Sequence, residues 1–174
     1  MVSNLYGDFV KGRDYSHYPE IVQKGIYLHR SIDNFIDTHP AVTELRLSLY
    51  PKLPKVAGIA IDLFFDHLLA RNWNRFHSKN YHLFLNEFYF YEADFEQELK
   101  KEFNEFIGYF RTRKWLDHYP TAFGLAKSCE GVAKRISFEN VLHKAPEQFY
   151  LREKEIQACF EIYMKDAILK FQDF

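Results

Sequence analysis

Residues 19–38 read PEIVQKGIYLHRSIDNFIDT, and this stretch predicts one long helix. Val22, Ile26, His29 and Asp33 recur three or four residues apart, so they share one face of that helix. The face is apolar at its start and ionisable in its middle. Because burying an unpaired charge costs several kcal/mol, we expect His29 and Asp33 to need a cation or each other.

A second ionisable group lies in residues 62–67, DLFFDH, where Asp62 and Asp66 are four residues apart and His67 comes next. On a helix, these two carboxylates share a face. Pairs of His and Asp on two neighbouring helices could supply a mixed nitrogen and oxygen shell for one or two divalent metal ions. The alternative is a structural network of buried His–Asp or Arg–Asp pairs. Two such groups in one chain favour a metal or catalytic site.

Length and composition predict one soluble domain that spans residues 1–174. Hydrophobic residues make up 47% of the chain, with 7 Gly and 6 Pro and no convincing alternating stretch, which predicts an all-α helical bundle. The formal charge of -1 argues against a nucleic-acid partner. Cys129 and Cys159 lack metal-type spacing, as reduced core residues do, and no apolar run is long enough for a membrane span. We therefore expect a cytoplasmic protein that does not bind membranes.

Hydrophobic periodicity and the positions of Gly and Pro predict a series of helices joined by short turns. The expected bounds are Ser3–Lys11, Pro19–Thr38, Ala41–Tyr50, Lys55–Trp73, Asn80–Phe110 with a break near residues 91–94, Thr121–Lys134, Ser137–Lys144 and Pro146–Phe171. Residues 115–119 are expected to form a connector.

Three blocks occur in order in the first part of the chain: Asn4–Gly12 (NLYGDFVKG), Gly25–Asp33 (GIYLHRSID) and Asp62–Trp73 (DLFFDHLLARNW). Together they resemble the acyl carrier protein phosphodiesterase family, also called acyl carrier protein hydrolase. The rest of the chain is similar only in length, helical character and aromatic richness. The resemblance implies an HD-domain-like helical bundle, distantly related to the HD-type metal phosphohydrolases.

The resemblance also implies an activity, which is hydrolysis of the phosphodiester that joins 4'-phosphopantetheine to a serine of holo-acyl carrier protein. It implies a Mn²⁺ cofactor, with Mg²⁺ or another divalent metal as the alternative. The metal ligands expected from the matched blocks are His29, Asp33, Asp62, Asp66 and His67. The catalytic residues expected from the same blocks are Asp8, Arg30, Asp66 and His67.

These residue types suit the reaction. A divalent ion bound by carboxylates and imidazoles lowers the pKa of bound water and neutralises charge on the phosphate. Arg30 could hold the phosphate in a two-pronged geometry that Lys cannot reproduce, and the alternative for Arg30 is a surface ion pair with Asp33 or Asp37. The family has a further upstream block of the type Asn-Phe-Leu-Ala-His-Leu, and its histidine has no counterpart in the printed residues.

Two other functions are compatible with the same residues. One is an HD-like phosphohydrolase that acts on a nucleotide or another small phosphoester, and the other is a non-catalytic module that binds carrier protein. Acyl carrier protein is the expected partner in the leading hypothesis. Because carrier proteins are acidic, candidate contacts are the basic residues Lys11, Arg13, Arg111, Arg113 and Lys114.

Overall fold

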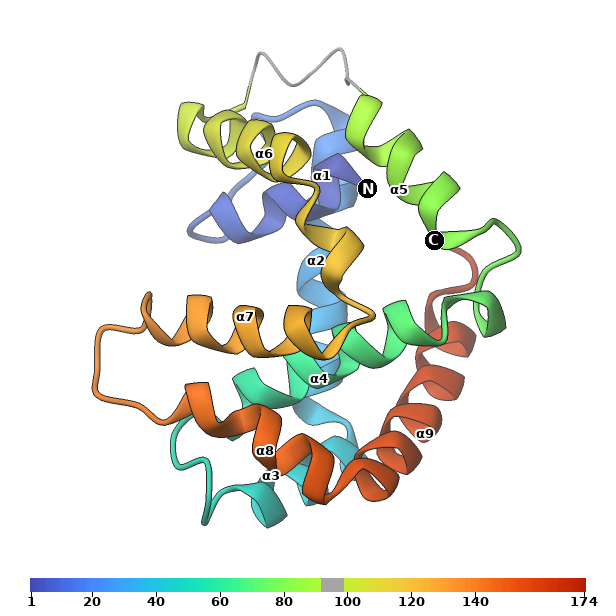
Figure 1. The fold of residues 1–174 in the computed structure, drawn as a ribbon. Coiled ribbons are helices and arrows are strands. Elements are labelled where there is room, and N and C mark those ends of the chain that lie inside the picture. Colours follow the sequence, from blue (N-terminus) through green and yellow to red (C-terminus); the bar gives the residue numbers. More distant parts are fainter. Residues whose placement is uncertain (92–98) are drawn as a thin grey trace.

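The structure is a computed structural model that describes residues 1–91 and 99–174. Within these ranges the chain forms α-helices and short 3-10 helices and no strand, which confirms the all-α fold (Figure 1). The α-helices are α1 (Val2–Leu5), α2 (Glu20–Thr38), α3 (Pro40–Leu49), α4 (Ala57–Arg71), α5 (Tyr81–Phe90), α6 (Lys101–Arg113), α7 (Ala122–Ala133), α8 (Ala145–Leu151) and α9 (Glu153–Phe171). The 3-10 helices are η1 (Tyr6–Phe9), η2 (Trp73–Arg75), η4 (Trp115–His118) and η5 (Leu142–Lys144).

The helices pack around two hydrophobic clusters. The lower cluster is formed mainly by α3, α4, α7, α8 and α9, and its fully buried side chains include Phe64 and Phe149. The upper cluster is formed by α1, η1, α5, α6 and the start of α2, with Tyr6 and Phe103 fully buried. Figure 1 shows α1, α5 and α6 at one end of the molecule and α3, α8 and much of α9 toward the other.

Helix α2 joins the two clusters. Val22 and Ile26 are fully buried in the upper cluster, whereas Phe35 packs against the lower one. His29 and Asp33 lie on the turns between these anchors. The ionisable residues of α2 are therefore placed at the junction, where neither cluster has to bury them completely.

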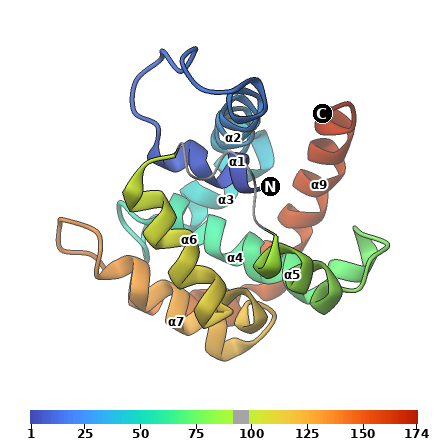
Figure 2. The same ribbon diagram turned by 90° about the horizontal axis from the view of Figure 1, so that it is seen from above.

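Two glycines allow α1 and η1 to approach α2 closely, as the view from above also shows (Figure 2). A Cβ atom at Gly25 would lie 2.5 Å from the Ser3 side chain, and one at Gly7 would lie 2.4 Å from the His29 ring. Since carbon atoms in contact are about 3.5 Å apart or more, a larger residue would push the segments apart. This close packing brings Asp8, which follows Gly7, over the middle of α2.

Most predicted helices lie within two residues of their expected bounds, and the differences are local. The first segment is α-helical only through Leu5 and then tightens into η1, and the expected turn over residues 137–144 is reduced to η5. The expected closing helix consists of α8 and α9, which meet at Arg152. The predicted break between α5 and α6 is present, although residues 92–94 lie outside the described part.

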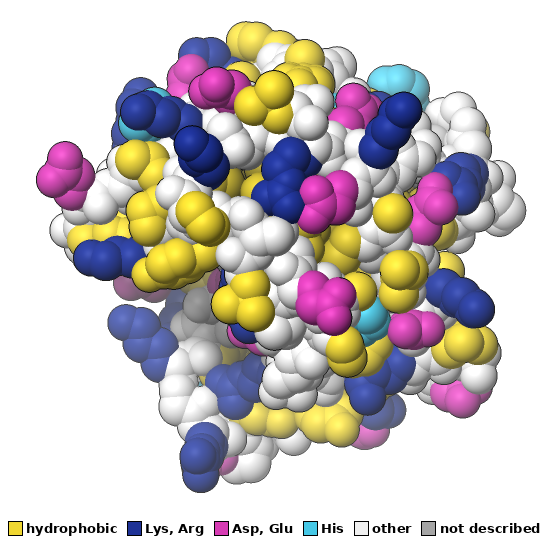
Figure 3. Space-filling model, turned by 90° about the horizontal axis from the view of Figure 1, so that it is seen from below, with side chains coloured by type: hydrophobic (Ala, Val, Ile, Leu, Met, Phe, Trp, Pro, Cys, Tyr) yellow, Lys and Arg dark blue, Asp and Glu magenta, His cyan; other side chains and the backbone are white. Residues whose placement is uncertain are grey.

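The surface and the cysteines agree with the composition. Of the described helices, none is both long and apolar enough to cross a membrane. The face seen from below mixes basic, acidic and apolar side chains (Figure 3), as the net charge of -1 suggests. Cys129 and Cys159 are both free and buried, which confirms them as core residues.

Candidate active site

Asp8 and Asp33 meet at the imidazole of His29. The Nε2 atom of His29 lies 3.1 Å from Asp8 Oδ1 and 3.2 Å from Asp33 Oδ2. Asp33 comes from the next turn of α2, as the four-residue spacing predicted, and Asp8 comes from η1. The side chain of His29 is 17% exposed, whereas those of Asp8 and Asp33 are 72% and 58% exposed. The carboxylates of Asp8 and Asp33 are thus exposed to solvent, whereas the His29 ring between them is mostly buried.

The electrostatics of this cluster depend on a single nitrogen. The hydrogen bond to Asp8 raises the pKa of His29, partial burial opposes this rise, and the negative charge of Asp33 adds to it. Burial raises the pKa of Asp33 itself. Nε2 can carry one proton, which it can donate to one carboxylate at a time. When it is deprotonated, the same nitrogen is available to a metal ion.

Asp62 and Asp66 form a second acidic pair on α4. Both side chains are exposed, although the neighbouring Ile61 and Phe64 are completely buried. The protein atoms around these carboxylates nevertheless raise the pKa of Asp62 and of Asp66 to about 7, because burial disfavours the charged form. For Asp62, the negative charge of Asp66 adds to the rise.

The acidic residues of α2 act on Asp62. The charges of Asp37 and Asp33 also raise the pKa of Asp62, and the nearby guanidinium of Arg46 on α3 lowers it. Arg46 is paired with Asp37, with 3.6 Å between Nη1 and Oδ1. Among the described residues, neither Asp62 nor Asp66 has an ion pair or a hydrogen bond of its own. The acidic faces of α2 and α4 therefore carry more negative charge than their neighbours neutralise.

The donor atoms suit a divalent cation, although the described side chains do not form a ready-made coordination shell. Carboxylate oxygen and imidazole nitrogen are ligands that Mn²⁺ accepts, and carboxylates also suit Mg²⁺. Within residues 1–91 and 99–174, no three His, Cys, Asp or Glu side chains converge into a group that could hold an ion as they stand. The contacts of His29 at 3.1 and 3.2 Å are direct hydrogen-bond distances. An ion would have to displace the shared proton and draw the exposed carboxylates toward it.

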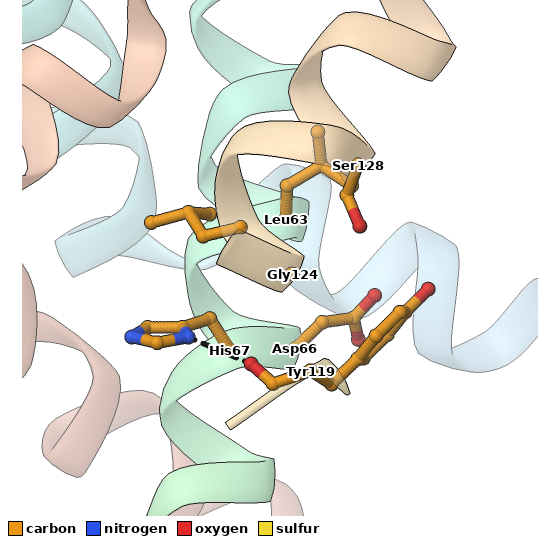
Figure 4. A pocket seen from close by; sticks show the side chains of 7 residues that line it. Leu63, Asp66, His67, Tyr119, Gly124 and Ser128 are labelled. Atoms are coloured by element: carbon orange, nitrogen blue, oxygen red, sulfur yellow. Dashed lines mark hydrogen bonds between the residues drawn. The ribbon is translucent and has the colours of Figure 1, made fainter. Parts of the chain in front are cut away.

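His67 points away from the acidic pair. Its Nδ1–H donates to the backbone oxygen of Tyr119 at 2.7 Å, and its ring meets Phe149 edge-on with 5.1 Å between ring centres. Figure 4 shows the side chains of His67 and Asp66 leaving α4 in different directions. The two side chains diverge because successive residues on a helix point about 100° apart. The expected role of His67 as a metal ligand beside Asp66 is therefore not supported by the direction of its ring. Burial lowers the pKa of His67, so the ring is neutral with a lone pair on Nε2.

Arg30 forms hydrogen bonds to the backbone of the loop that follows η1. Its Nη2 donates to the backbone oxygens of Val10 and Gly12 at 3.0 and 2.7 Å, and its guanidinium lies 5.1 Å from the ring centre of Tyr15. No ion pair between Arg30 and a carboxylate of α2 is present in the described part of the chain. The alternative role of Arg30 as an ion-pair partner is therefore wrong, and its contact with phosphate stays a prediction.

Three residues lie at the site without having been predicted there, namely Asp37, Arg46 and Tyr119. Asp37 continues the four-residue series that begins at His29 and Asp33, so spacing alone could have identified it. Arg46 reaches the acidic cluster from α3, and Tyr119 follows η4, which the chain brings to α4 from 52 residues away. No local pattern marks the last two residues.

Comparisons with known proteins identify the family of this chain. A family model described as acyl carrier protein phosphodiesterase matches residues 1–167. Proteins named acyl carrier protein phosphodiesterase from Salmonella agona and Salmonella newport are each 33% identical to this chain over 134 residues, which is 76% of this chain and 69% of theirs. No solved structure matches this chain. The chain belongs to the acyl carrier protein phosphodiesterase family.

Proposed function

We propose that this chain hydrolyses the phosphodiester between 4'-phosphopantetheine and a serine of holo-acyl carrier protein. Water adds to phosphorus, the bond from phosphorus to the serine oxygen breaks, and the products are apo-carrier protein and free 4'-phosphopantetheine. The match to the family model over residues 1–167 and the names of the Salmonella relatives support this activity. They support acyl carrier protein as the substrate in the same way.

The observation that carries the proposal is the unneutralised charge on Asp62 and Asp66. Two carboxylates that lie side by side without a described cation are costly for a purely structural role, and the pKa of each is raised to about 7. The residues that would hold a divalent ion are His29, Asp33, Asp62 and Asp66. Mn²⁺ is the proposed cofactor, with Mg²⁺ as the alternative. His67 is left out of this set because its ring faces Tyr119 and Phe149.

Each group has a definite chemical task. A bound divalent ion would supply Lewis-acid activation of water and charge neutralisation of the phosphate. Asp8 is more exposed than Asp33 or His29, and we assign it to accept a proton from the attacking water. Without the ion, His29 holds the Asp8 carboxylate in place through Nε2, and the absence of a side chain at Gly7 allows this close approach.

The test is incubation of the pure protein with holo-acyl carrier protein and Mn²⁺, followed by mass spectrometry of the carrier. Loss of the phosphopantetheine mass is the expected result, and a chelator should abolish it. A parallel screen with nucleotides and small phosphodiesters covers the alternative phosphohydrolase. If those compounds are hydrolysed while the carrier protein stays unchanged with Mn²⁺ and with Mg²⁺, the substrate is a small phosphoester and not the carrier protein. Carrier binding that survives chelation, without any turnover, would indicate the non-catalytic module.

A further inference from the structure

The connection between η4 and α7 forms one wall of a narrow crevice next to the acidic pair. This crevice lies between α4 and the start of α7, and its lining includes Asp66, His67, Tyr119 and Gly124. Figure 4 shows that the ring of Tyr119 lies beside the carboxylate of Asp66, while the backbone oxygen of Tyr119 faces His67 on the other side. One residue thus contacts α4 with its backbone and approaches the acidic site with its side chain.

The backbone around Tyr119 is fixed from three directions. His67 donates to the Tyr119 oxygen at 2.7 Å. The Thr121 hydroxyl donates to the His118 oxygen at 2.7 Å and accepts from the Gly124 N–H at 3.0 Å, so it ties the connector to the start of α7. Gly124 packs so tightly that a Cβ atom there would lie 1.9 Å from the His118 oxygen. The base of the Tyr119 side chain is therefore held more rigidly than a connector residue usually is.

The hydroxyl of Tyr119 is left free by this arrangement. It has no hydrogen-bond partner among the residues that the structure describes. A phenol has an ordinary pKa of about 10, so it keeps its proton at neutral pH and can donate a hydrogen bond. A neutral donor beside a carboxylate and near a proposed cation position suits an anionic oxygen of a phosphoester.

We propose that the Tyr119 hydroxyl donates a hydrogen bond to a non-bridging oxygen of the substrate phosphodiester, and that His67 is a positioning residue that aims it. This assignment rests on the proposed function and extends it to a residue outside the matched blocks. It also gives His67 a task that its geometry supports, since its donor nitrogen is already engaged with Tyr119.

The first test compares Tyr119→Phe with wild type in two measurements made with Mn²⁺. These are turnover of holo-carrier protein and calorimetric binding of 4'-phosphopantetheine. Loss of one hydrogen bond to a charged group should weaken both by about 10- to 100-fold. Tyr150→Phe is the matched control, because Tyr150 is 48% exposed on α8, and it should change neither measurement. Unfolding curves should be the same for all three proteins.

The two measurements separate this proposal from the proposed function. If wild type leaves holo-carrier protein intact but binds 4'-phosphopantetheine, the carrier activity fails while the role of Tyr119 is still tested by binding. Equal binding by wild type and Tyr119→Phe would overturn the role of Tyr119, as would absence of binding by wild type.

The positioning role of His67 is tested by coupling. His67→Phe removes the Nδ1–H donor and should weaken 4'-phosphopantetheine binding, whereas His67→Gln retains an N–H donor and should restore part of it. In the Tyr119→Phe background, His67→Phe should add little further loss, because the two residues act as one unit. Full additivity of the two losses, or equal effects of Phe and Gln at position 67, would show that His67 does not act through Tyr119.

Discussion

Replacing Gly7 by Ala adds a single methyl group, and we expect its steric overlap with His29 to disrupt the site. The added Cβ would lie 2.4 Å from both Cγ and Cδ2 of His29 and 2.6 Å from its Cβ. Carbon atoms in contact are about 3.5 Å apart, so η1 and the His29 side chain must separate by about 1 Å. Overpacking of this kind costs about 1–3 kcal/mol of unfolding free energy. Because Asp8 follows Gly7, the same movement breaks its 3.1 Å contact with His29 and should lower turnover strongly.

The assay is urea unfolding together with turnover of holo-carrier protein and the imidazole NMR signals of His29. Gly108→Ala is the matched control, since no atom lies within 4 Å of a Cβ added there on α6. That control should keep full activity and gain up to about 1 kcal/mol from the lower flexibility of the unfolded chain. If Gly7→Ala matches wild type in stability, activity and His29 signals, the close approach of η1 and α2 does not organise the site.

Three further predictions concern the acidic residues and the loop beside them. Asp66→Ala should abolish metal-dependent turnover with unchanged helical content and equal or greater stability without metal. An unfolded variant would show that Asp66 has a structural role instead. Without metal, the unfolding free energy of wild type should rise as the pH falls from about 8 to about 5, because the folded-state pKa values of Asp62 and Asp66 are raised from 3.8 to about 7 and the folded state therefore binds more protons. Asp62→Asn combined with Asp66→Asn should flatten that rise in urea titrations, and an unchanged slope would contradict the assignment. Reversing Lys11 and Arg13 to Glu should slow capture of carrier protein in stopped-flow measurements at low salt, whereas salt-insensitive capture would exclude this loop as a docking surface.

The parts of the site that sequence predicted are those set by the geometry of a single helix. The pairing of His29 with Asp33 follows from a four-residue spacing, and the same rule places Asp62 over Asp66. The bounds of α2 were predicted because Pro19 and the His39-Pro40 step interrupt the helical pattern at both ends. Local rules were sufficient wherever both partners lay within one or two helical turns.

The remaining parts depend on how distant segments pack. The ring of His67 is turned toward Tyr119 because α7 and η4 cover that side of α4, and nothing near residue 67 in the sequence encodes this cover. Arg30 finds backbone oxygens in the loop after η1, which compete successfully with the carboxylates one turn away. Partners of long polar side chains were therefore the least predictable feature of the site.

The position of the site follows from the two hydrophobic clusters. Carboxylates that repel one another raise the free energy of the folded chain, and Arg46, which already pairs with Asp37, offsets that cost only in part. The folded chain tolerates these carboxylates because each hydrophobic cluster is packed by its own apolar residues, Ile26 in the upper cluster and Phe64 in the lower one. The acidic residues contribute little to packing and can be arranged for binding a cation. A loss of activity without a loss of stability is therefore the expected mark of this site.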